Sequence, residues 1–229
     1  MRAAMIAMLA MSATGCSKAA DRGPPAKHAP TPKPTTDTPA DQLGTLAPGT
    51  GLAVGQHVPD VQALDLDGKP VRLADLVAKG PLLLVFYRGG WCPYCNFEIH
   101  EMTTAYPEYR KRGVLPIAVS VDVPEEGAKT SATYTIPFPV LSDSPLAFIN
   151  AFHVANHVDD ATLAKMKGFG VDLEKSSGQT HHTIAMPALF LIDTQGVIRW
   201  AHDDPSYTVR PSTAQILGAI DAAHLGSAP

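Results

Sequence analysis

The sequence contains few cysteines and few charged residues, and each shortage excludes a class of protein. Only three of its 229 residues are cysteine, which is too few for a disulfide-stapled scaffold. The formal net charge is −4, so the chain lacks the basic surplus typical of nucleic-acid-binding proteins, and we expect no nucleic-acid partner. Charged residues make up 17% and hydrophobic residues 45%, a balance typical of a globular protein rather than a disordered one.

The three cysteines are unevenly distributed. Two of them, Cys92 and Cys95, lie in the stretch FYRGGWCPYCNFEI, and the third, Cys16, is far away in the sequence. This arrangement predicts one working pair and one cysteine with a separate role.

The first residues have the plan of a secretory signal. In residues 1–15, Arg2 precedes an unbroken apolar stretch and small residues follow, and the apolar stretch is too short to span a membrane. The letters ATGC resemble the lipobox of bacterial lipoproteins, although Ala13 stands where leucine is commonest. The resemblance implies that Cys16 is lipidated, which would anchor an exported protein to a membrane facing the periplasm. Ser17 favours the outer membrane over the inner one. The alternative is an ordinary cleaved signal peptide.

Residues 16–50 are expected to form a tether between the anchor and a folded domain. They are rich in proline, alanine and threonine and contain almost no large apolar side chains. Such a segment cannot bury enough surface to offset the entropy of ordering it. We therefore predict a single folded domain over residues 51–229, a length sufficient for one well-buried core.

The domain is predicted to be an α/β fold, with a mixed central sheet, helices on both faces and an N-terminal β-hairpin. The hairpin turns at Asp67-Gly68, and the apolar run 81–87 is typical of a central strand buried on both faces. A helix should start at Pro93 and either kink or end at Pro107. Its buried stripe should contain Cys95, Ile99, Met102 and Tyr106. The remaining strands are expected at 114–122, 137–143, 184–193 and 197–201, and the remaining helices at 124–135, 144–152 and 212–223, with residues 153–182 irregular.

The position of the cysteine pair predicts redox chemistry. Where a buried strand passes into a helix, the helix N-terminus stabilises a thiolate and lowers the thiol pKa. A structural zinc site would need two more ligands, and only histidines are available. A purely structural disulfide at this spacing would close a tiny loop and would constrain the unfolded chain little. Redox chemistry therefore remains the favoured reading, with these two as alternatives.

With the strand, the cysteine pair and MPALFLID identified, the domain resembles the thioredoxin-fold superfamily. It is most similar to the peroxiredoxin-like branch, the alkyl hydroperoxide reductase/thiol-specific antioxidant family. WCPYC looks like the thioredoxin WCxxC motif, and Met186-Pro187 looks like the cis-proline loop that faces the active cysteines in that superfamily. The resemblance implies a thioredoxin-like fold and a thiol-dependent oxidoreductase.

The match to peroxiredoxins is partial. Phe86 and Tyr87 match, Cys95 takes the peroxidatic position, and Glu98 matches the acid that follows it. Three positions differ: Arg88 replaces a proline, Cys92 replaces a threonine, and Pro187 replaces an arginine. The hydroxyl and guanidinium groups that bind peroxide in the family are thus missing from their usual places, which favours disulfide exchange over efficient peroxide reduction.

The resulting hypothesis gives each cysteine a role. Cys92, expected to be the more exposed thiol, attacks a substrate disulfide, and Cys95 then resolves the mixed disulfide. Glu98 is expected to manage the Cys95 proton, and Pro187 to guide the substrate. In a thiol peroxidase, the alternative, the roles of the cysteines would swap. The substrate is expected to contact four further residues: Trp91, Pro93, Tyr94 and Met186.

No organic cofactor is implied, because the Cys92–Cys95 disulfide itself carries the electrons. The expected partners are protein or small-molecule disulfides, with hydroperoxides as the alternative substrates, and a thiol electron donor. A second alternative is a copper chaperone of the Sco type, which would use Cys92, Cys95, His181 and His182 as ligands. That family spaces its cysteines as CxxxC, whereas this chain has CxxC. The ordinary reading of His153, His157 and the other two histidines is a set of solvent-facing loop side chains.

Overall fold

The computed structural model describes residues 49–223 and 225. The predicted signal peptide, the lipidation site Cys16 and nearly all of the predicted tether therefore lie outside the described residues. No helix in the described part of the chain is both long enough and apolar enough to cross a membrane.

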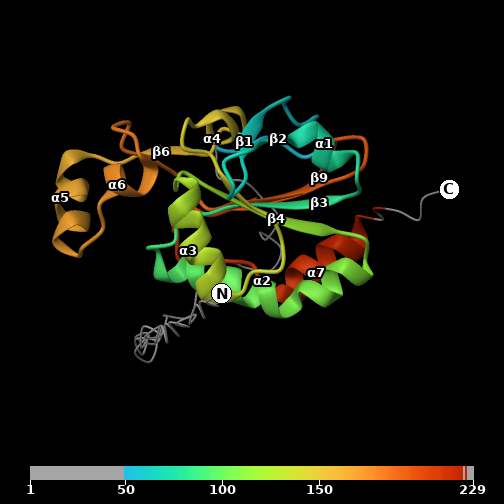
Figure 1. Ribbon diagram of the computed structural model, residues 1–229. Coiled ribbons are helices and arrows are strands. Elements are labelled where there is room, and N and C mark those ends of the chain that lie inside the picture. Colours follow the sequence, from blue (N-terminus) through green and yellow to red (C-terminus); the bar gives the residue numbers. More distant parts are fainter. Residues whose placement is uncertain (1–48, 224, 226–229) are drawn as a thin grey trace, which may run out of the picture. The chain divides into compact units, whose positions relative to one another are not determined.

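A seven-stranded mixed sheet forms the centre of the domain, in the order β2-β1-β5-β4-β3-β8-β9 (Figure 1). β3 pairs in parallel with β4 on one side and antiparallel with β8 on the other. All five residues of β3 and of β8 are buried, as their unbroken apolar sequences predict. The strands span Gln62–Leu64 (β1), Pro70–Arg72 (β2), Leu82–Phe86 (β3), Leu115–Ser120 (β4), Val140–Ser142 (β5), Ala188–Ile192 (β8) and Ile198–Asp203 (β9).

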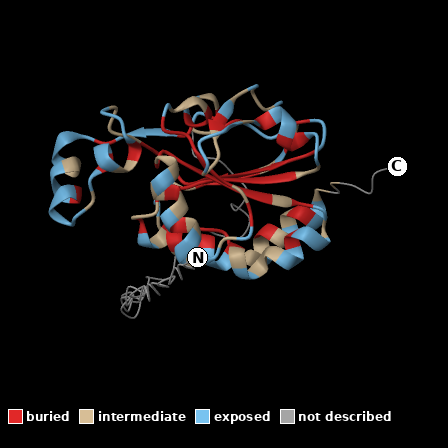
Figure 2. Cartoon of the chain, in the orientation of Figure 1, coloured by how far each residue is buried: buried red, intermediate tan, exposed pale blue. Residues whose placement is uncertain are grey.

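Helices cover both faces of this sheet, so the buried layer runs through the middle of the domain (Figure 2). α2 and α7 pack on one face, where Ile99 and Ile216 share a core cluster, and α1 and α4 pack on the other, where Leu73 and Phe148 share a second. The predicted fold class and N-terminal hairpin are confirmed. The helices span Leu73–Val77 (α1), Pro93–Lys111 (α2), Pro124–Tyr134 (α3), Ala147–Ala151 (α4), Asp160–Gly168 (α5), Leu173–Ser177 (α6) and Thr213–Ala222 (α7).

α2 does not end at Pro107, and its buried stripe differs from the predicted one. The helix runs on to Lys111, with Pro107 inside it. A proline removes one backbone donor, but Tyr109, fully buried beyond it, packs into the core cluster and holds the last turn in place. Tyr106, predicted to be buried, is only half-buried.

Residues 153–182, predicted to be irregular, contain regular structure. β6 (Ala155–His157) pairs antiparallel with β7 (Thr183–Ala185) in a separate two-stranded sheet. α5 and α6 lie between these strands and protrude at one end of the domain (Figure 1). Asp159 and Asp172 cap the two helices by accepting hydrogen bonds from backbone N–H groups. These elements are short and mostly exposed, so they lack the apolar periodicity by which longer elements are recognised.

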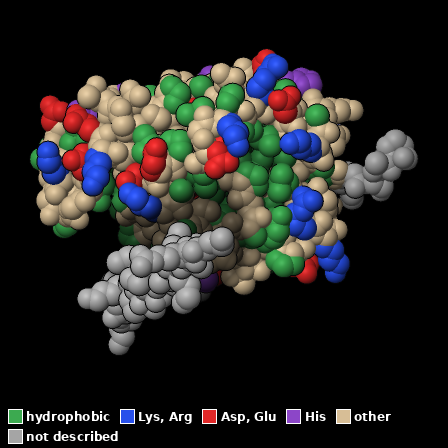
Figure 3. Space-filling view, in the orientation of Figure 1, with side chains coloured by type: hydrophobic (Ala, Val, Ile, Leu, Met, Phe, Trp, Pro, Cys, Tyr) green, Lys and Arg blue, Asp and Glu red, His purple; other side chains and the backbone are tan. Residues whose placement is uncertain are grey.

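Charged side chains of both signs are interspersed over the face shown in Figure 3. No extended patch of one sign appears on that face, which accords with the small net charge of the sequence.

Candidate active site

The two central cysteines lie where β3 passes into α2. Cys92 is the N-cap of α2, and Pro93 is its first residue, a position that suits proline because no backbone donor is needed there. Cys95 follows in the first turn. The two Sγ atoms are 2.9 Å apart, with the Cys95 thiol donating to Cys92, and both cysteines are free thiols.

Both thiols are buried. Cys92 is 1% exposed and Cys95 is 0% exposed, so the expected order holds by a small margin only, and neither thiol is open to solvent in this structure. Trp91 and Tyr94 pack against the core cluster that contains both cysteines. Cys92 is thus part of the buried core, which a motif alone does not reveal.

The cysteines differ in acidity. The Cys95 hydrogen bond, with smaller contributions from the charges of Arg88 and Arg210, lowers the pKa of Cys92 to about 7 despite its burial. Burial raises the pKa of Cys95 well above its ordinary value, and the adjacent Cys92 raises it further. At neutral pH a substantial fraction of Cys92 is therefore thiolate, whereas Cys95 remains the thiol that donates to it.

A buried ion pair lies beneath Cys95. Arg210 Nε donates to Glu98 Oε2 at 2.8 Å, and both side chains are only 4% exposed. Arg210 Nη1 donates to the Val209 carbonyl at 2.6 Å, and Nη2 lies 4.0 Å from Cys95 Sγ. Burial raises the pKa of Glu98, while Arg210 acts to lower it.

Arg210 was missed by sequence reasoning. The family resemblance places a guanidinium at the position of Pro187, yet the chain supplies one from the segment between β9 and α7. No local pattern marks Arg210, because its partner Glu98 is 112 residues away.

Two glycines, Gly89 and Gly90, allow the loop that leads to Cys92 to adopt its conformation. Gly89 has a φ of +147°, which side-chain-bearing residues rarely adopt. Gly90 N–H donates to Asp122 Oδ2 at 2.8 Å, and Asn96 Nδ2 donates to the Gly90 carbonyl at 2.7 Å. A Cβ on Gly90 would lie 1.9 Å from Thr130 Oγ1, so only glycine fits. Burial raises the pKa of Asp122 to about 6.

Arg88 and three aromatic rings form the outer part of the site. The Arg88 guanidinium carbon lies 5.3 Å from the centroid of the Trp91 ring and 4.3 Å from that of Tyr207. The rings of Tyr94 and Tyr207 meet edge to face with centroids 5.6 Å apart. Trp91 and Tyr94 thus lie beside the cysteines as predicted from the sequence, whereas Arg88 and Tyr207 were not predicted site residues.

The Met186-Pro187 segment lies at the same end of the sheet. Ala188 pairs with Phe86 in the β3–β8 register, so Pro187 is level with the start of the cysteine loop. Pro187 is buried and Met186 is half-buried. No described peptide bond is cis, so the bond before Pro187 is trans and departs from the cis-proline loop that the resemblance implies.

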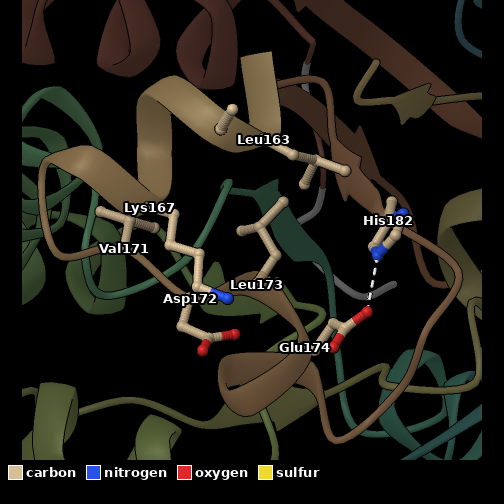
Figure 4. A pocket seen from close by; sticks show the side chains of 8 residues that line it. Leu163, Lys167, Val171, Asp172, Leu173, Glu174 and His182 are labelled. Atoms are coloured by element: carbon tan, nitrogen blue, oxygen red, sulfur yellow. Dashed lines mark hydrogen bonds and ion pairs between the residues drawn. The ribbon is translucent and has the colours of Figure 1, made fainter. Parts of the chain in front are cut away.

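The histidines are engaged elsewhere. His181 Nε2 lies 3.0 Å from the Ser144 carbonyl oxygen, and His182 Nε2 lies 2.8 Å from Glu174 Oε1 at a small pocket between α5 and α6 (Figure 4). His153 and His157 are exposed. Within residues 49–223, no three His, Cys, Asp or Glu side chains are grouped so as to hold a metal ion. The structure therefore does not bring the four proposed copper ligands together.

Comparisons with known proteins agree with this geometry. Residues 54–201 match the AhpC/TSA family. The chain is 34% identical over 112 residues to thiol-disulfide oxidoreductase ResA of Bacillus cereus, covering 48% of this chain and 64% of that protein. It is 37% identical over 106 residues to ResA of Geobacillus thermodenitrificans, covering 46% and 60%. The match thus spans less than two thirds of the length of each relative.

Solved structures show the same fold. Peroxidoxin BcpB from Mycobacterium tuberculosis superposes with a TM-score of 0.59 at 19% identity, covering 76% of this chain and 97% of that one. Reduced Prx3 from Vibrio vulnificus, in complex with H2O2, superposes with a TM-score of 0.60 at 18% identity, covering 74% and 99%.

Proposed function

This chain belongs to the AhpC/TSA family, and from that membership we propose that it is a thiol–disulfide oxidoreductase whose working dithiol is Cys92 and Cys95. One observation carries the proposal: a Cys92 thiol with a pKa of about 7 accepts a hydrogen bond from a second thiol 2.9 Å away. A thiolate present at neutral pH is the species that attacks disulfides, and a neighbouring thiol can release the product.

The reaction has two steps. The Cys92 thiolate attacks one sulfur of a substrate disulfide, the substrate S–S bond breaks, and one half leaves as a thiolate. Cys95 then loses its proton to solvent or to the departing thiolate and attacks Cys92 Sγ. This attack releases the second half and forms the Cys92–Cys95 disulfide. The substrate gains the two electrons that the dithiol loses, and a thiol electron donor must return them.

The buried ion pair supports the second step. Cys95 must become a thiolate to attack, and its burial opposes that charge. Arg210, with Nη2 4.0 Å from Cys95 Sγ, stabilises the developing negative charge. Glu98 holds Arg210 in place and balances its charge, which is a positioning role beside the proton-managing role predicted from the sequence.

A thiol peroxidase is the second candidate, and the same guanidinium favours it. Arg210 places positive charge beside Cys95, the position of the peroxidatic cysteine in the family resemblance. In that reaction Cys95 would attack a peroxide and become a sulfenic acid, and Cys92 would resolve it. The raised pKa of Cys95 argues for the first candidate, because few Cys95 thiolates are present at neutral pH.

The test compares two oxidants on the reduced full-length protein. Trp91 fluorescence is followed in a stopped-flow instrument after mixing with hydrogen peroxide or with glutathione disulfide. We expect rapid oxidation by the disulfide, accumulation of a mixed disulfide in Cys95→Ser, and no reaction in Cys92→Ser. A fast peroxide reaction that survives Cys92→Ser and disappears in Cys95→Ser would establish the peroxidase instead.

We also propose that the protein is an exported lipoprotein anchored through Cys16. This rests on the signal-like residues 1–15 and the lipobox resemblance. Cell fractionation should find wild-type protein with the membrane and Cys16→Ser in the soluble fraction. Equal membrane association of the two would contradict the anchor.

A further inference from the structure

The site contains two arginines, and among the described residues only Arg210 is paired with a carboxylate. Arg210 is neutralised by Glu98, and its Nε and Nη1 donors are both engaged by protein oxygens. Arg88 forms no ion pair with any acidic side chain that the structure describes, and its buried Nε has no hydrogen-bond partner there. Arg88 therefore has no carboxylate partner among the described residues, and its charge acts on the Cys92 thiolate.

The charge of Arg88 acts on the sulfur atom that is proposed to react, Cys92 Sγ. Arg88 lies four residues before Cys92, on the loop that ends in that cysteine, and its charge acts on the Cys92 thiol. The loop from Arg88 to Cys92 is held in place by two hydrogen bonds of Gly90, one to Asp122 and one to Asn96. Arg88 and Cys92 thus belong to one loop whose backbone is held at Gly90.

Two aromatic rings lie close to the guanidinium of Arg88. The rings of Trp91 and Tyr207 lie against the guanidinium, with its carbon 5.3 Å and 4.3 Å from the ring centroids. Stacking of this kind uses the flat face of a guanidinium. Its N–H donors lie in the plane and have the fork geometry that binds a carboxylate with two parallel hydrogen bonds.

We propose that Arg88 is a substrate-binding residue that selects disulfides carrying a carboxylate close to the sulfur atoms. The aromatic rings lie against the guanidinium, and the substrate supplies the carboxylate partner that the described residues do not. The inference rests on the proposed function and deepens it by naming the substrate class. Low-molecular-weight acidic disulfides and protein disulfides with an adjacent acidic residue share this chemistry.

The test uses three disulfides with similar aliphatic cores and different charge. These are 3,3′-dithiodipropionate, which is anionic, 2-hydroxyethyl disulfide, which is neutral, and cystamine, which is cationic. The rate at which each disulfide oxidises the reduced full-length protein is divided by the rate at which the same disulfide oxidises dithiothreitol in the same buffer. This division removes the intrinsic reactivity of each disulfide.

Wild-type protein should favour the anionic over the neutral disulfide by about fivefold, as expected for one partly exposed charge pair. Arg88→Gln should abolish this ratio, and Arg88→Lys should retain part of it. Arg110→Gln, which removes an exposed arginine near the far end of α2, is the matched control and should leave the ratio unchanged. In wild-type protein, added salt should lower the ratio.

The anionic-to-neutral ratio separates recognition from thiol activation. Arg88→Gln also removes a charge that stabilises the Cys92 thiolate, but this loss slows all three disulfides together and does not change the ratio. An unchanged ratio in Arg88→Gln, or a wild-type ratio insensitive to salt, would overturn the inference while leaving the proposed function standing. Failure of wild-type protein to react with any of the three disulfides would instead overturn the proposed function, and the inference with it.

Discussion

Arg210 and Glu98 form an ion pair of 2.8 Å in an interior where each side chain is 4% exposed, although 112 residues separate them in the sequence. The pair joins the segment before α7 to the first turns of α2, beneath Cys95. A buried charge is tolerated only when it is paired, so each of these residues depends on the other.

Breaking this pair should strongly destabilise the protein. Glu98→Gln and Arg210→Gln each leave one uncompensated buried charge, and we expect a loss of about 3–5 kcal/mol in the free energy of unfolding. Urea denaturation of the reduced protein measures it. Lys129→Gln, which breaks the exposed pair with Glu126, is the control and should change stability far less. Losses below about 1 kcal/mol in both buried variants would contradict a stabilising pair.

The alkylation rate of Cys92 should depend on pH with a midpoint near 7. The thiolate is the reactive form, so the rate with iodoacetamide should rise as pH passes through the pKa of Cys92, which is about 7. Cys95→Ala removes the hydrogen bond that contributes most to this low value, and its midpoint should move upward by about one unit or more. Mass spectrometry identifies the alkylated residue. An unchanged midpoint in Cys95→Ala would show that the Cys95 thiol does not activate Cys92.

Asp122 should make the protein less stable as pH rises from about 4 to 7. Its pKa in the folded protein is about 6, above the ordinary value of 3.8, so the folded state binds more protons than the unfolded state between those values. The stabilisation is therefore complete below pH 3.8 and is lost as pH rises through 6. Asp122→Asn cannot ionise, so its stability relative to wild type should improve by about 2–3 kcal/mol over this range.

Urea denaturation at several pH values measures this difference. The matched control is Asp67→Asn, which makes the same substitution in the exposed hairpin turn. A constant difference between wild type and Asp122→Asn would contradict an ionisation that burial opposes.

Gly90→Ala should disturb the cysteine loop. The added methyl group would lie 1.9 Å from Thr130 Oγ1, so the loop or α3 must shift, at a cost of about 1–3 kcal/mol. We also expect a slower reaction of Cys92 with disulfides, because the loop positions it. Thr130→Ala removes the obstructing hydroxyl and should restore part of both losses in the double variant, as a double-mutant cycle measures.

Gly168→Ala is the control for this substitution. Nothing lies within 4 Å of a Cβ built on Gly168, so alanine should be tolerated there. If Gly90→Ala behaved like Gly168→Ala, the close approach of Gly90 to Thr130 would have no energetic consequence.

The sequence predicts well those features that depend on near neighbours. The apolar run around Leu84 specifies a strand buried on both faces, and Pro93 marks the start of a helix. The cysteine pair is recognisable because a spacing of three and a strand-to-helix transition are both local patterns. Short, exposed elements such as β6 and α6 carry little apolar periodicity and were not predicted.

The sequence by itself determined the fold class and marked Cys92 and Cys95 as the candidate reactive pair, because strand, turn and helix signals act over a few residues. The tertiary structure alone decided how that pair is surrounded. Arg210 lies beside Cys95 because the chain returns past α2 before forming α7. Cys92 is buried in a core cluster that also contains Leu189 and Ile216, which lie far from it in the sequence. Both outcomes depend on long-range packing, in which the partners of a side chain are set by topology rather than by sequence spacing.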